Sequence, residues 1–435
     1  MTQTSNLNNI QNQPARRVFL KNTLLMAVGA ALPSLGLAQP LFMHGASHDY
    51  IHGEIEPFWG RHQGGIATPM QKFSYFIAFD LVTEKKQDIV TLLRAWTEAA
   101  AKMTRHAAEA APNSERDKTP EDSGDSLGIS PERLTITFGF GVTLFEKEGV
   151  DRYGLAKQRP VALADLPKFT GDQLIVERTG GDLSVQACAD DPVVVEHAIR
   201  RLAAFANGIA KIRWAQTGFT GGFNEGDTPR NQMGFKDGTM NISTKDNASM
   251  QQFVWVGDEG PVWMRDGSYM VIRPIRIALD HWDKMKLGFQ EQTVGRQKYS
   301  GAPIGGQHEF EKLDLDAVDK EGNPLIAENS HARLAAPSSN DGAQILRRAY
   351  AYDNGVTNIA ERWPPWRQVV TFDAGLLFQC YQRDPRTGFS KIFEKMAKFD
   401  MLNQFTTHIG NGLFACPPGA MPGEYIGQRL FEASV

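Results

Sequence analysis

Three polar side chains, spread over about 110 residues, have the types needed for acid–base and metal chemistry. Asp237 lies in Gly234–Thr239, where two glycines let the backbone turn tightly and approach a ligand closely. An isolated Asp-Gly pair is also a common structural turn, so this stretch alone decides nothing. Further along, His331 opens a His-Ala-Arg segment and Arg347 opens an Arg-Arg segment. Together they offer an acid or base, a metal ligand and a fixed positive charge.

The order and context of these residues resemble the dye-decolourising haem peroxidases. That family has a Gly-x-x-Asp-Gly loop on the distal side of a haem, a proximal His in a His-x-Arg segment, and a distal Arg in an Arg-Arg-Gly-like segment. Residues 58–69 resemble its Gly-x-His-Gln-x-Gly-Ile-x-Thr-Pro segment, and residues 295–304 its Gly-Arg-x-Lys-x-x-Gly-x-Pro stretch. The resemblance covers roughly residues 57–430. It is closest to the deferrochelatase/peroxidases exported by the twin-arginine pathway.

The resemblance implies haem b as the cofactor, one per chain, with His331 as the iron ligand. An imidazole ligand leaves the opposite coordination position free for hydrogen peroxide. Asp237 would move a proton between the two peroxide oxygens, and Arg347 would stabilise the departing one. Because an unperturbed carboxyl group has a pKa of about 4, we expect activity to favour acidic pH. The haem contacts implied by position are Gly238, Thr239, Met240, Ala336, Pro337, Ser338 and Arg347.

Two segments depart from the family's pattern. The family commonly has Ala-Asn-Pro-Arg after the proximal His, where this chain has Ala335-Ala336-Pro337-Ser338. Arg-Arg-Gly is replaced by Arg347-Arg348-Ala349. Loss of the Asn and Arg alters the polar contacts that this loop can offer to haem, without changing the ligand.

Two functions stay open at this point. The first is a periplasmic haem peroxidase that uses hydrogen peroxide to oxidise phenolic or dye-like donors, and that also releases iron from haem with the porphyrin left intact, for iron acquisition. The alternative is a non-catalytic periplasmic haem-binding or haem-carrier protein. Small aromatic reductants, haem and iron-uptake components are the expected partners. The family also implies a homodimer.

Neighbouring residues and other histidines need separate interpretation. Arg347 and Arg348 cannot both enter one pocket from a strand, because adjacent side chains face opposite sides. We therefore expect Arg348 to face solvent or to form an ion pair. His281 and His308 are interpreted as surface and loop residues. A carboxylate should hold the far nitrogen of His331, but the sequence does not identify it.

The N-terminus has the features of an export signal. Arg16-Arg17 precedes an apolar run that ends in Gly36-Leu37-Ala38, too short for a membrane anchor, which predicts a twin-arginine signal peptide over residues 1–38 and a periplasmic protein. Residues 39–56 are predicted to form a mobile tail; His44, His48 and His52 in it could alternatively contact a metal or haem.

Composition excludes several classes of protein. Cleavage would leave 43 basic and 50 acidic residues, a net charge of −7, and no basic patch is visible, so nucleic acid is not expected as a partner. Cys188, Cys380 and Cys416 form no Cys-x-x-Cys pair. Three cysteines are too few for a disulfide-dense scaffold, and they lack the spacing of a zinc or iron–sulfur site. One disulfide between two of them is still compatible with the sequence.

The hydrophobic pattern predicts an α+β fold. Apolar and β-branched runs predict four strands, and amphipathic segments predict two helices, the second opened by Asp191-Pro192. The predicted strands are 74–80, 134–140, 173–178 and 183–188, and the predicted helices are 84–109 and 191–206.

The second half of the chain repeats the first. Ser74-Tyr75 recurs as Ser268-Tyr269, at an offset of 194 residues, and Asp191-Pro192 recurs as Asp384-Pro385, at an offset of 193. We predict an N-terminal half over 57–245 and a C-terminal half over 246–435. The family implies that these are duplicated ferredoxin-like halves with antiparallel sheets packed together, of the dimeric α+β barrel type.

Two further segments stand out. Residues 288–340 form an insertion of low periodicity that delivers His331, so we interpret it as functional. Trp363 and Trp366 are interpreted as packing residues, with a redox relay as the alternative.

Overall fold

The computed structural model describes residues 54–106, 116–118, 120, 122–221, 227–361 and 367–432. Residues 1–38, the tail residues His44, His48 and His52, and Trp363 and Trp366 lie outside the described residues. None of the helices in the described part is long and apolar enough to cross a bilayer.

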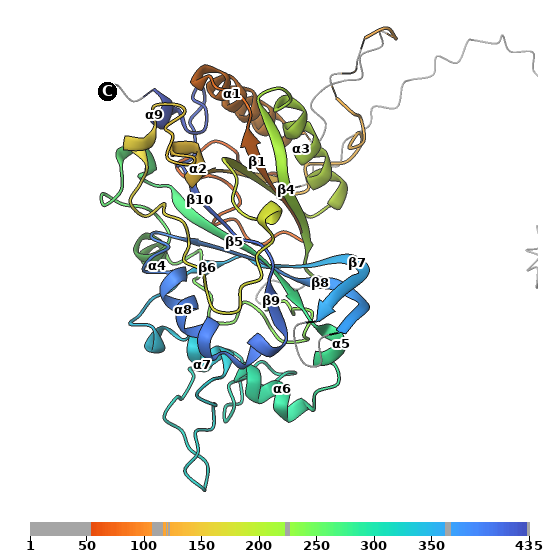
Figure 1. The fold of residues 1–435 in the computed structure, drawn as a ribbon, viewed down its shortest axis with the longest axis vertical. Coiled ribbons are helices and arrows are strands. Elements are labelled where there is room, and N and C mark those ends of the chain that lie inside the picture. The colour runs from red at the N-terminus through yellow and green to blue at the C-terminus, as the bar shows by residue number, and fades with distance from the viewer. Residues whose placement is uncertain are drawn as a thin grey trace, which may run out of the picture. The chain divides into compact units, whose positions relative to one another are not determined.

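The strands of the N-terminal half lie in the spatial order β4-β1-β3-β2 and are antiparallel (Figure 1). They are β1 (Phe73–Leu81), β2 (Thr135–Gly141), β3 (Leu183–Ala189) and β4 (Ala210–Phe219). Every residue of β2 and β3 is buried, because these central strands are covered on both faces. Helices follow β1 and β3, so this half has the order of a ferredoxin-like unit.

Two amphipathic helices pack on this part of the sheet, α1 (Lys86–Met103) and α3 (Pro192–Phe205). The Asp191 side chain accepts hydrogen bonds from the backbone N–H groups of Val193 and Val194, and Pro192 occupies the first turn. This capping explains why the second predicted helix begins where expected. Trp96 of α1 is buried and donates its indole N–H to the Leu202 carbonyl of α3 at 2.7 Å, which ties the helices together.

The C-terminal half repeats the same arrangement in the order β10-β5-β8-β7. Its strands are β5 (Ser268–Ile277), β7 (Tyr350–Glu361), β8 (Arg367–Gln382) and β10 (Gly412–Cys416), with the short strands β6 (Leu346–Arg347) and β9 (Thr406–His408) added. Helix α8 (Phe389–Phe399) follows β8 as α3 follows β3. The predicted duplicated ferredoxin-like α+β fold is therefore confirmed.

The two sets of strands join at both edges. Strand β2 pairs with β10, and β4 pairs with β7 through Phe219 and Ala351. Because β5 also pairs with β8, eight strands form one closed ring rather than two separate sheets. The backbone packs closely where β2 ends beside the start of β3: a Cβ added at Gly141 would lie 1.9 Å from the Gly181 carbonyl oxygen. Cys188, Cys380 and Cys416 are buried within this core as free thiols.

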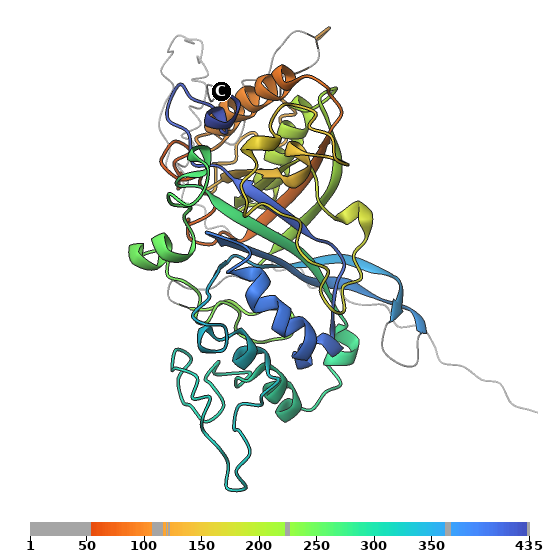
Figure 2. The ribbon, with the colours of Figure 1, turned by 60° about the vertical axis from the view of Figure 1, so that its left-hand side comes forward.

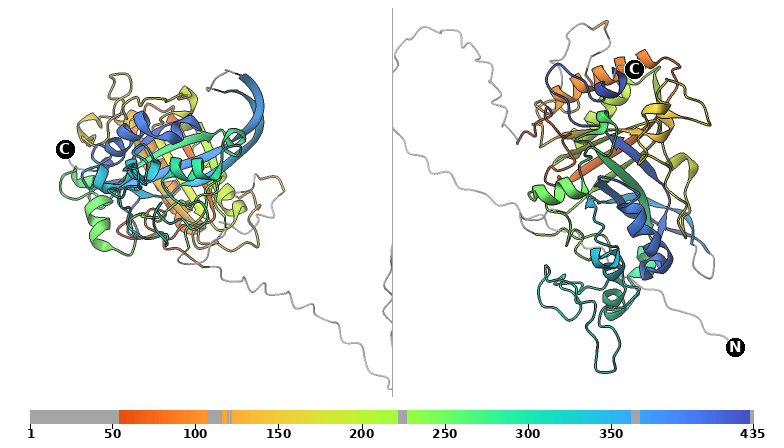
Figure 3. Two further views of the ribbon diagram at one scale, coloured as in Figure 1. Left: turned by 90° about the horizontal axis from the view of Figure 1, so that it is seen from below. Right: turned by 90° about the vertical axis from the view of Figure 1, so that its left-hand side faces the viewer.

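Further elements connect these strands. The β7–β8 hairpin extends away from the remaining strands (Figure 2). The loops that follow α6 lie at the opposite end of the molecule from α1 (Figure 3). The short helices are α2 (Val142–Phe145), α4 (Asn247–Phe253), α5 (Leu279–Trp282), α6 (Leu287–Val294), α7 (His331–Ala335) and α9 (Gln428–Phe431), and the 3-10 turns are Ala156–Gln158, Val176–Arg178, Val262–Met264, Pro337–Ser339 and Met401–Gln404.

Two predictions about elements need correction. The strand predicted at 173–178 is wrong: Gln173 and Ile175 donate backbone N–H groups to the carbonyls of His408 and Ile409, and a 3-10 turn follows. Val176 is 72% exposed, so its β-branched side chain reflects no buried strand. The first predicted helix, 84–109, is too long at both ends: α1 covers Lys86–Met103, residues 104–106 are not helical, and residues 107–109 lie outside the described residues.

Candidate functional site

A cavity of about 280 Å³ lies among the Asp237 loop, strand β5 and helices α7 and α8. We call it the haem cavity because it gathers the residues predicted to hold haem. Those that line it are Asp237, Gly238, Thr239, Met240, His331, Ala336, Pro337 and Arg347. Ser338 is not among its lining residues.

His331 is the first residue of α7, in the turn that follows Ser330. Leu334 on the same helix packs against Ile392 and Met396 of α8, which fixes the helix in place. Asn340 supports its other end by donating to the carbonyls of Leu334 and Ala336, at 2.7 and 2.9 Å. The imidazole therefore projects from a short, well-supported helix.

The carboxylate that the sequence could not identify is Asp400. Its Oδ2 lies 2.7 Å from His331 Nδ1, so this nitrogen is bonded to the carboxylate and Nε2 is the ring nitrogen left to bind a metal. Burial is the largest single effect and lowers the pKa of His331, but the charge and hydrogen bond of Asp400, together with the charge of Asp237, outweigh it, so the pKa lies above its usual value. Asp400 itself is 5% exposed and also accepts from the Leu402 backbone N–H.

Asp237 lies on a loop built by local side-chain bonds. The Asn231 side chain accepts from the backbone N–H groups of Met233 and Phe235, which turns the chain back on itself. Asp237 donates its own backbone N–H to the Pro229 carbonyl at 2.8 Å. Gly238 has φ 132°, a conformation that a residue with a side chain rarely adopts, so the glycine is required directly after the acid.

Arg347 on β6 reaches the same loop. Its Nη1 lies 3.4 Å from Asp237 Oδ1, and its Nη2 donates to the Thr239 carbonyl at 3.0 Å. The Asn241 side chain holds the Arg347 backbone on both sides, with Nδ2 donating to the carbonyl at 2.8 Å and Oδ1 accepting from the N–H at 2.9 Å. The acid and the cation are therefore positioned by one connected set of bonds.

Glu309 clamps the two residues that flank Asp237-Gly238. Lys236 Nζ and Thr239 Oγ1 both donate to its carboxylate, Thr239 at 2.9 Å. Burial raises the pKa of Glu309, but its hydrogen bonds from Lys236, Thr228 and Thr239 lower it by more, so the net shift is downward. Glu309 belongs to the insertion 288–340, which therefore supplies both the His331 helix and this support for the Asp237 loop.

The expectation for Arg348 is wrong. Arg348 is 4% exposed and points to the other face of the chain from Arg347, into the interior of the strand ring. It donates to the Thr68 carbonyl at 2.6 Å and to the Gln71 side chain. The prediction that Arg347 and Arg348 face opposite sides is correct. The side that Arg348 faces is the protein core and not solvent, because the strands close into a ring.

The residues around the cavity fit a haem. Many of the residues that line it are apolar, which would suit the face of a porphyrin, and His331 would offer Nε2 to the iron. Arg296 also lines the cavity; it is 8% exposed, and burial lowers its pKa from the usual value. The apolar residues are Ile275, Ile277, Leu376, Phe378, Phe389, Ile392 and Met396.

Fold and site together define a haem peroxidase built on two ferredoxin-like halves. Residues 63–220 match the family model for the N-terminal part of Dyp-type peroxidases, and residues 228–421 match that for the C-terminal part. The chain belongs to the Dyp-type peroxidases, and it is an enzyme of this haem-dependent family.

Individual relatives agree with this family. The chain is 35% identical over 432 residues to the deferrochelatase of Escherichia coli strain K12, covering 97% of this chain and 98% of that one. It is similar to ferric DtpA from Streptomyces lividans, with 38% identity, a TM-score of 0.78, and coverage of 91% and 100% of the two chains. A DyP-type peroxidase from Streptomyces coelicolor has 39% identity and a TM-score of 0.78, with 87% and 98% covered.

Sequence reasoning missed Asp400, Glu309 and the structural use of Asn241. Asp400 is 69 residues from His331, and no local pattern marks it. Glu309 lies in a charged stretch with other acids. Of these three residues, only Asn241 is marked by a sequence pattern, because it ends the glycine-rich segment that carries Asp237.

Proposed function

We propose that this chain is an exported haem b peroxidase that uses hydrogen peroxide to oxidise phenolic or dye-like donors. The observation that carries the proposal is the shared cavity, in which Asp237 and Arg347 lie 3.4 Å apart and His331 is bonded to Asp400. An acid, a cation and a neutral metal-ligating nitrogen are the three groups that cleavage of peroxide requires.

His331 Nε2 would hold the iron, and one haem per chain would occupy the cavity. The backbone at Gly238, Thr239 and Met240 and at Ala336 and Pro337 would line the macrocycle, with Ser338 adjoining it. When bound, haem supplies the redox centre at which the oxygen–oxygen bond breaks. The neutral imidazole stays oriented because Asp400 accepts the hydrogen bond from Nδ1–H.

Asp237 takes a proton from one oxygen of hydrogen peroxide and returns it to the other. Arg347 stabilises the negative charge on the departing oxygen, which leaves as water. Each of two phenolic donors then loses one electron and one proton, so two donors and one hydrogen peroxide give two phenoxyl radicals and two waters. The Asp237 carboxylate is 23% exposed, which leaves it accessible to peroxide.

Export and iron release form the second part of the proposal. The predicted signal segment 1–38 supports twin-arginine export to the periplasm, where a folded haem protein can be delivered. Similarity to deferrochelatases supports release of iron from haem with the porphyrin intact. The same similarity supports partnership with iron-uptake components. Membership of the family supports formation of a homodimer. The boundary between the halves at 245 and 246 stays a prediction.

An absorption spectrum of the mature protein reconstituted with haem tests the ligand assignment. We expect a Soret band in the wild type that shifts or is lost in His331→Ala, and peroxide-dependent oxidation of guaiacol in the wild type only. His281→Ala is the matched control, because His281 lies away from the haem cavity and should leave the spectrum unchanged. Absence of specific haem binding in the wild type would overturn the assignment.

A non-catalytic haem carrier is the alternative function. It is separated from the peroxidase by turnover, because a carrier has no use for Asp237 and Arg347. Recovery of metal-free porphyrin after incubation with haem and a reductant would support deferrochelatase activity. Recovery of intact haem alone, with no peroxide turnover, would favour the carrier.

A further inference from the structure

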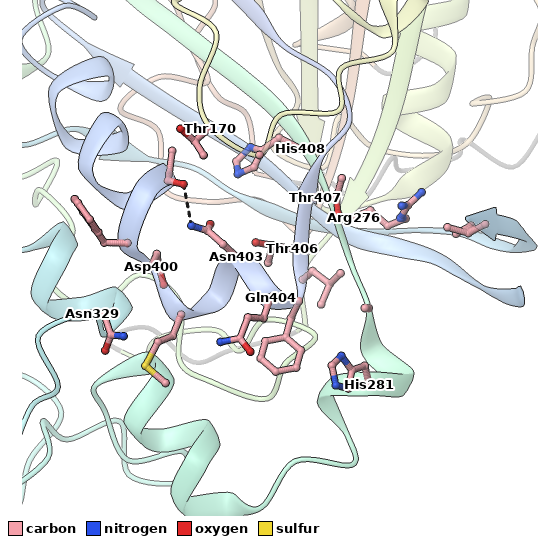
Figure 4. Close-up of a pocket in the computed structure, with 18 of the residues that line it drawn as sticks. Thr170, Arg276, His281, Asn329, Asp400, Asn403, Gln404, Thr406, Thr407 and His408 are labelled. Atoms are coloured by element: carbon pink, nitrogen blue, oxygen red, sulfur yellow. Dashed lines mark hydrogen bonds between the residues drawn. The ribbon is translucent and has the colours of Figure 1, made fainter. Parts of the chain in front are cut away.

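A second cavity, of about 950 Å³, adjoins the haem cavity, and Asp400 lines both (Figure 4). The two histidines that line it, His281 and His408, lie apart from each other. Among the described residues, three groups able to hold one metal ion come together at a different place, in the N-terminal half. We call them the His197 cluster, and they are Asp122, Asp125 and His197.

The His197 cluster joins a loop to a helix. His197 lies on α3, whereas Asp122 and Asp125 lie in the connection between α1 and β2. The side chains of His197 and Asp122 are 1% and 6% exposed, so protein encloses both. The Gly124 backbone N–H donates to Asp122 Oδ1 at 2.7 Å, which leaves Oδ2 as the oxygen near the ring. The fold therefore places a buried imidazole between two carboxylates.

Asp125 determines which ring nitrogen of His197 carries hydrogen. Its Oδ1 lies 2.6 Å from His197 Nδ1, and Arg200 donates to its Oδ2 at 2.6 Å. Burial raises the pKa of Asp125, but hydrogen bonds from Ser123 and His197 lower it by more, to about 2. An ionised carboxylate only accepts hydrogen bonds, so Nδ1 is the donor. In the neutral imidazole, the lone pair is then on Nε2.

His197 Nε2 faces Asp122 without a hydrogen bond. Within the part of the chain that the structure describes, this buried nitrogen has no hydrogen-bond partner, although Asp122 Oδ2 is only 3.3 Å away. A lone pair and a carboxylate at this distance repel each other, so they need a positive charge between them. A shared proton would give a charge-assisted hydrogen bond of about 2.7–2.9 Å. Two ligands of a tetrahedral ion, each about 2.0–2.1 Å from the metal, are about 3.3 Å apart, so the separation fits a metal ion better than a proton.

We propose that Asp122 Oδ2 and His197 Nε2 bind a divalent transition-metal ion of the zinc type, with Asp125 orienting the imidazole. Imidazole nitrogen and carboxylate oxygen are both zinc ligands, and a carboxylate on the far nitrogen is the usual support of a metal-binding histidine. Water completes the coordination. The ion clips the connection between α1 and β2 to α3. None of the three residues lines the haem cavity, so the proposal does not depend on the peroxidase function.

Zinc binding to the haem-loaded mature protein tests the site. Calorimetric titration with Zn²⁺ is done in a background in which the three tail histidines are replaced by glutamine, because they can also bind zinc. We expect His197→Gln and Asp122→Asn each to bind one Zn²⁺ fewer per chain than this background. Glu196→Gln is the matched control, because Glu196 is an exposed acid on the same helix, and it should bind as the background does.

Two further measurements keep the test decisive if His197→Gln fails to fold. Zn²⁺ should raise the Tm of the background protein above its value in EDTA, but should not raise that of Asp122→Asn. Asp125→Asn should keep the site and raise the Kd for zinc by about 10- to 100-fold. Guaiacol oxidation should be unaffected in Asp122→Asn, so failure of the peroxidase assignment is seen separately. If Asp122→Asn binds as much zinc as the background, the cluster is only a hydrogen-bonded imidazolium and the proposal is wrong.

Discussion

Nδ1 of His331 lies 2.7 Å from Oδ2 of Asp400, and the carboxylate is almost fully buried, with 3% of its side chain exposed. A buried charge beside the imidazole fixes its tautomer and makes its other nitrogen a stronger electron donor. The same carboxylate reaches a second cavity, so one residue connects the ligand to two separate spaces.

Asp400→Asn keeps the shape of this side chain but removes its charge. We expect haem affinity or peroxidase turnover to fall by about 10- to 100-fold, the usual effect of losing such a partner. Haem titration of the apoprotein and guaiacol turnover measure the two quantities. Asp341→Asn is the control, because that aspartate is 86% exposed and pairs with Lys391; an equal loss in both variants would contradict a specific role for Asp400.

Asp237→Asn should leave haem bound and slow its reaction with peroxide. The amide cannot take up the peroxide proton, so we expect the bimolecular rate to fall by about 100- to 10,000-fold. Stopped-flow mixing of the haem-loaded protein with hydrogen peroxide gives this rate directly. Asp227→Asn, on the same loop, serves for comparison. A rate within a few-fold of wild type would remove Asp237 from the mechanism.

Glu309→Gln tests the clamp on the Asp237 loop. The amide retains a hydrogen bond with Thr239 but loses the charge that holds Lys236, so the loop should position Asp237 less well. We expect kcat with peroxide to fall by about 10-fold while the haem spectrum is kept. Glu311→Gln, two residues on, is the matched control. An unchanged kcat would show that the clamp is not needed for positioning.

Glu309 also predicts a pH dependence of stability. Its pKa in the folded protein is lowered, so its contribution is fully present above the unfolded value of about 4.3 and is lost as pH falls through the folded pKa. We expect the Tm of Glu309→Gln to lie below that of the wild type at pH 7, and the difference between the two Tm values to be smaller at pH 3. Thermal unfolding at both pH values measures it. An equal Tm loss at both pH values would argue against a role for the charge.

The buried pair Arg273–Asp172 predicts a non-additive effect on stability. Both side chains are at most 2% exposed, and burial lowers the pKa of Arg273 and raises that of Asp172. Arg273→Met leaves the carboxylate unpaired and should cost about 3–5 kcal/mol of unfolding free energy, whereas Arg273→Met/Asp172→Leu should cost much less. Urea unfolding measures both. A double variant as unstable as the single one would contradict this account.

The sequence was informative where chemistry or periodicity is local. Asp191 before Pro192 marked the start of a helix, and the glycines around Asp237 marked a tight loop. The strand predicted at 173–178 failed because its β-branched residues are exposed and its N–H groups bond to the segment around His408. Asp400 and the inward direction of Arg348 depend on how distant segments close around one another, which no local pattern contains.

The two halves of the ring meet at two seams, which are the strand pairs β2–β10 and β4–β7. Exchanging the halves turns β2 into β7 and β4 into β10, so the β2–β10 seam maps onto the β7–β4 seam. That is the pattern of an isologous contact between two identical subunits. A chain of half this length could close the same ring by pairing with its own copy. The strands and helices that line the cavity of His331 all come from the C-terminal half, and only the Asp237 loop reaches it from the end of the N-terminal half, so the two halves of the ring contribute unequally to the site.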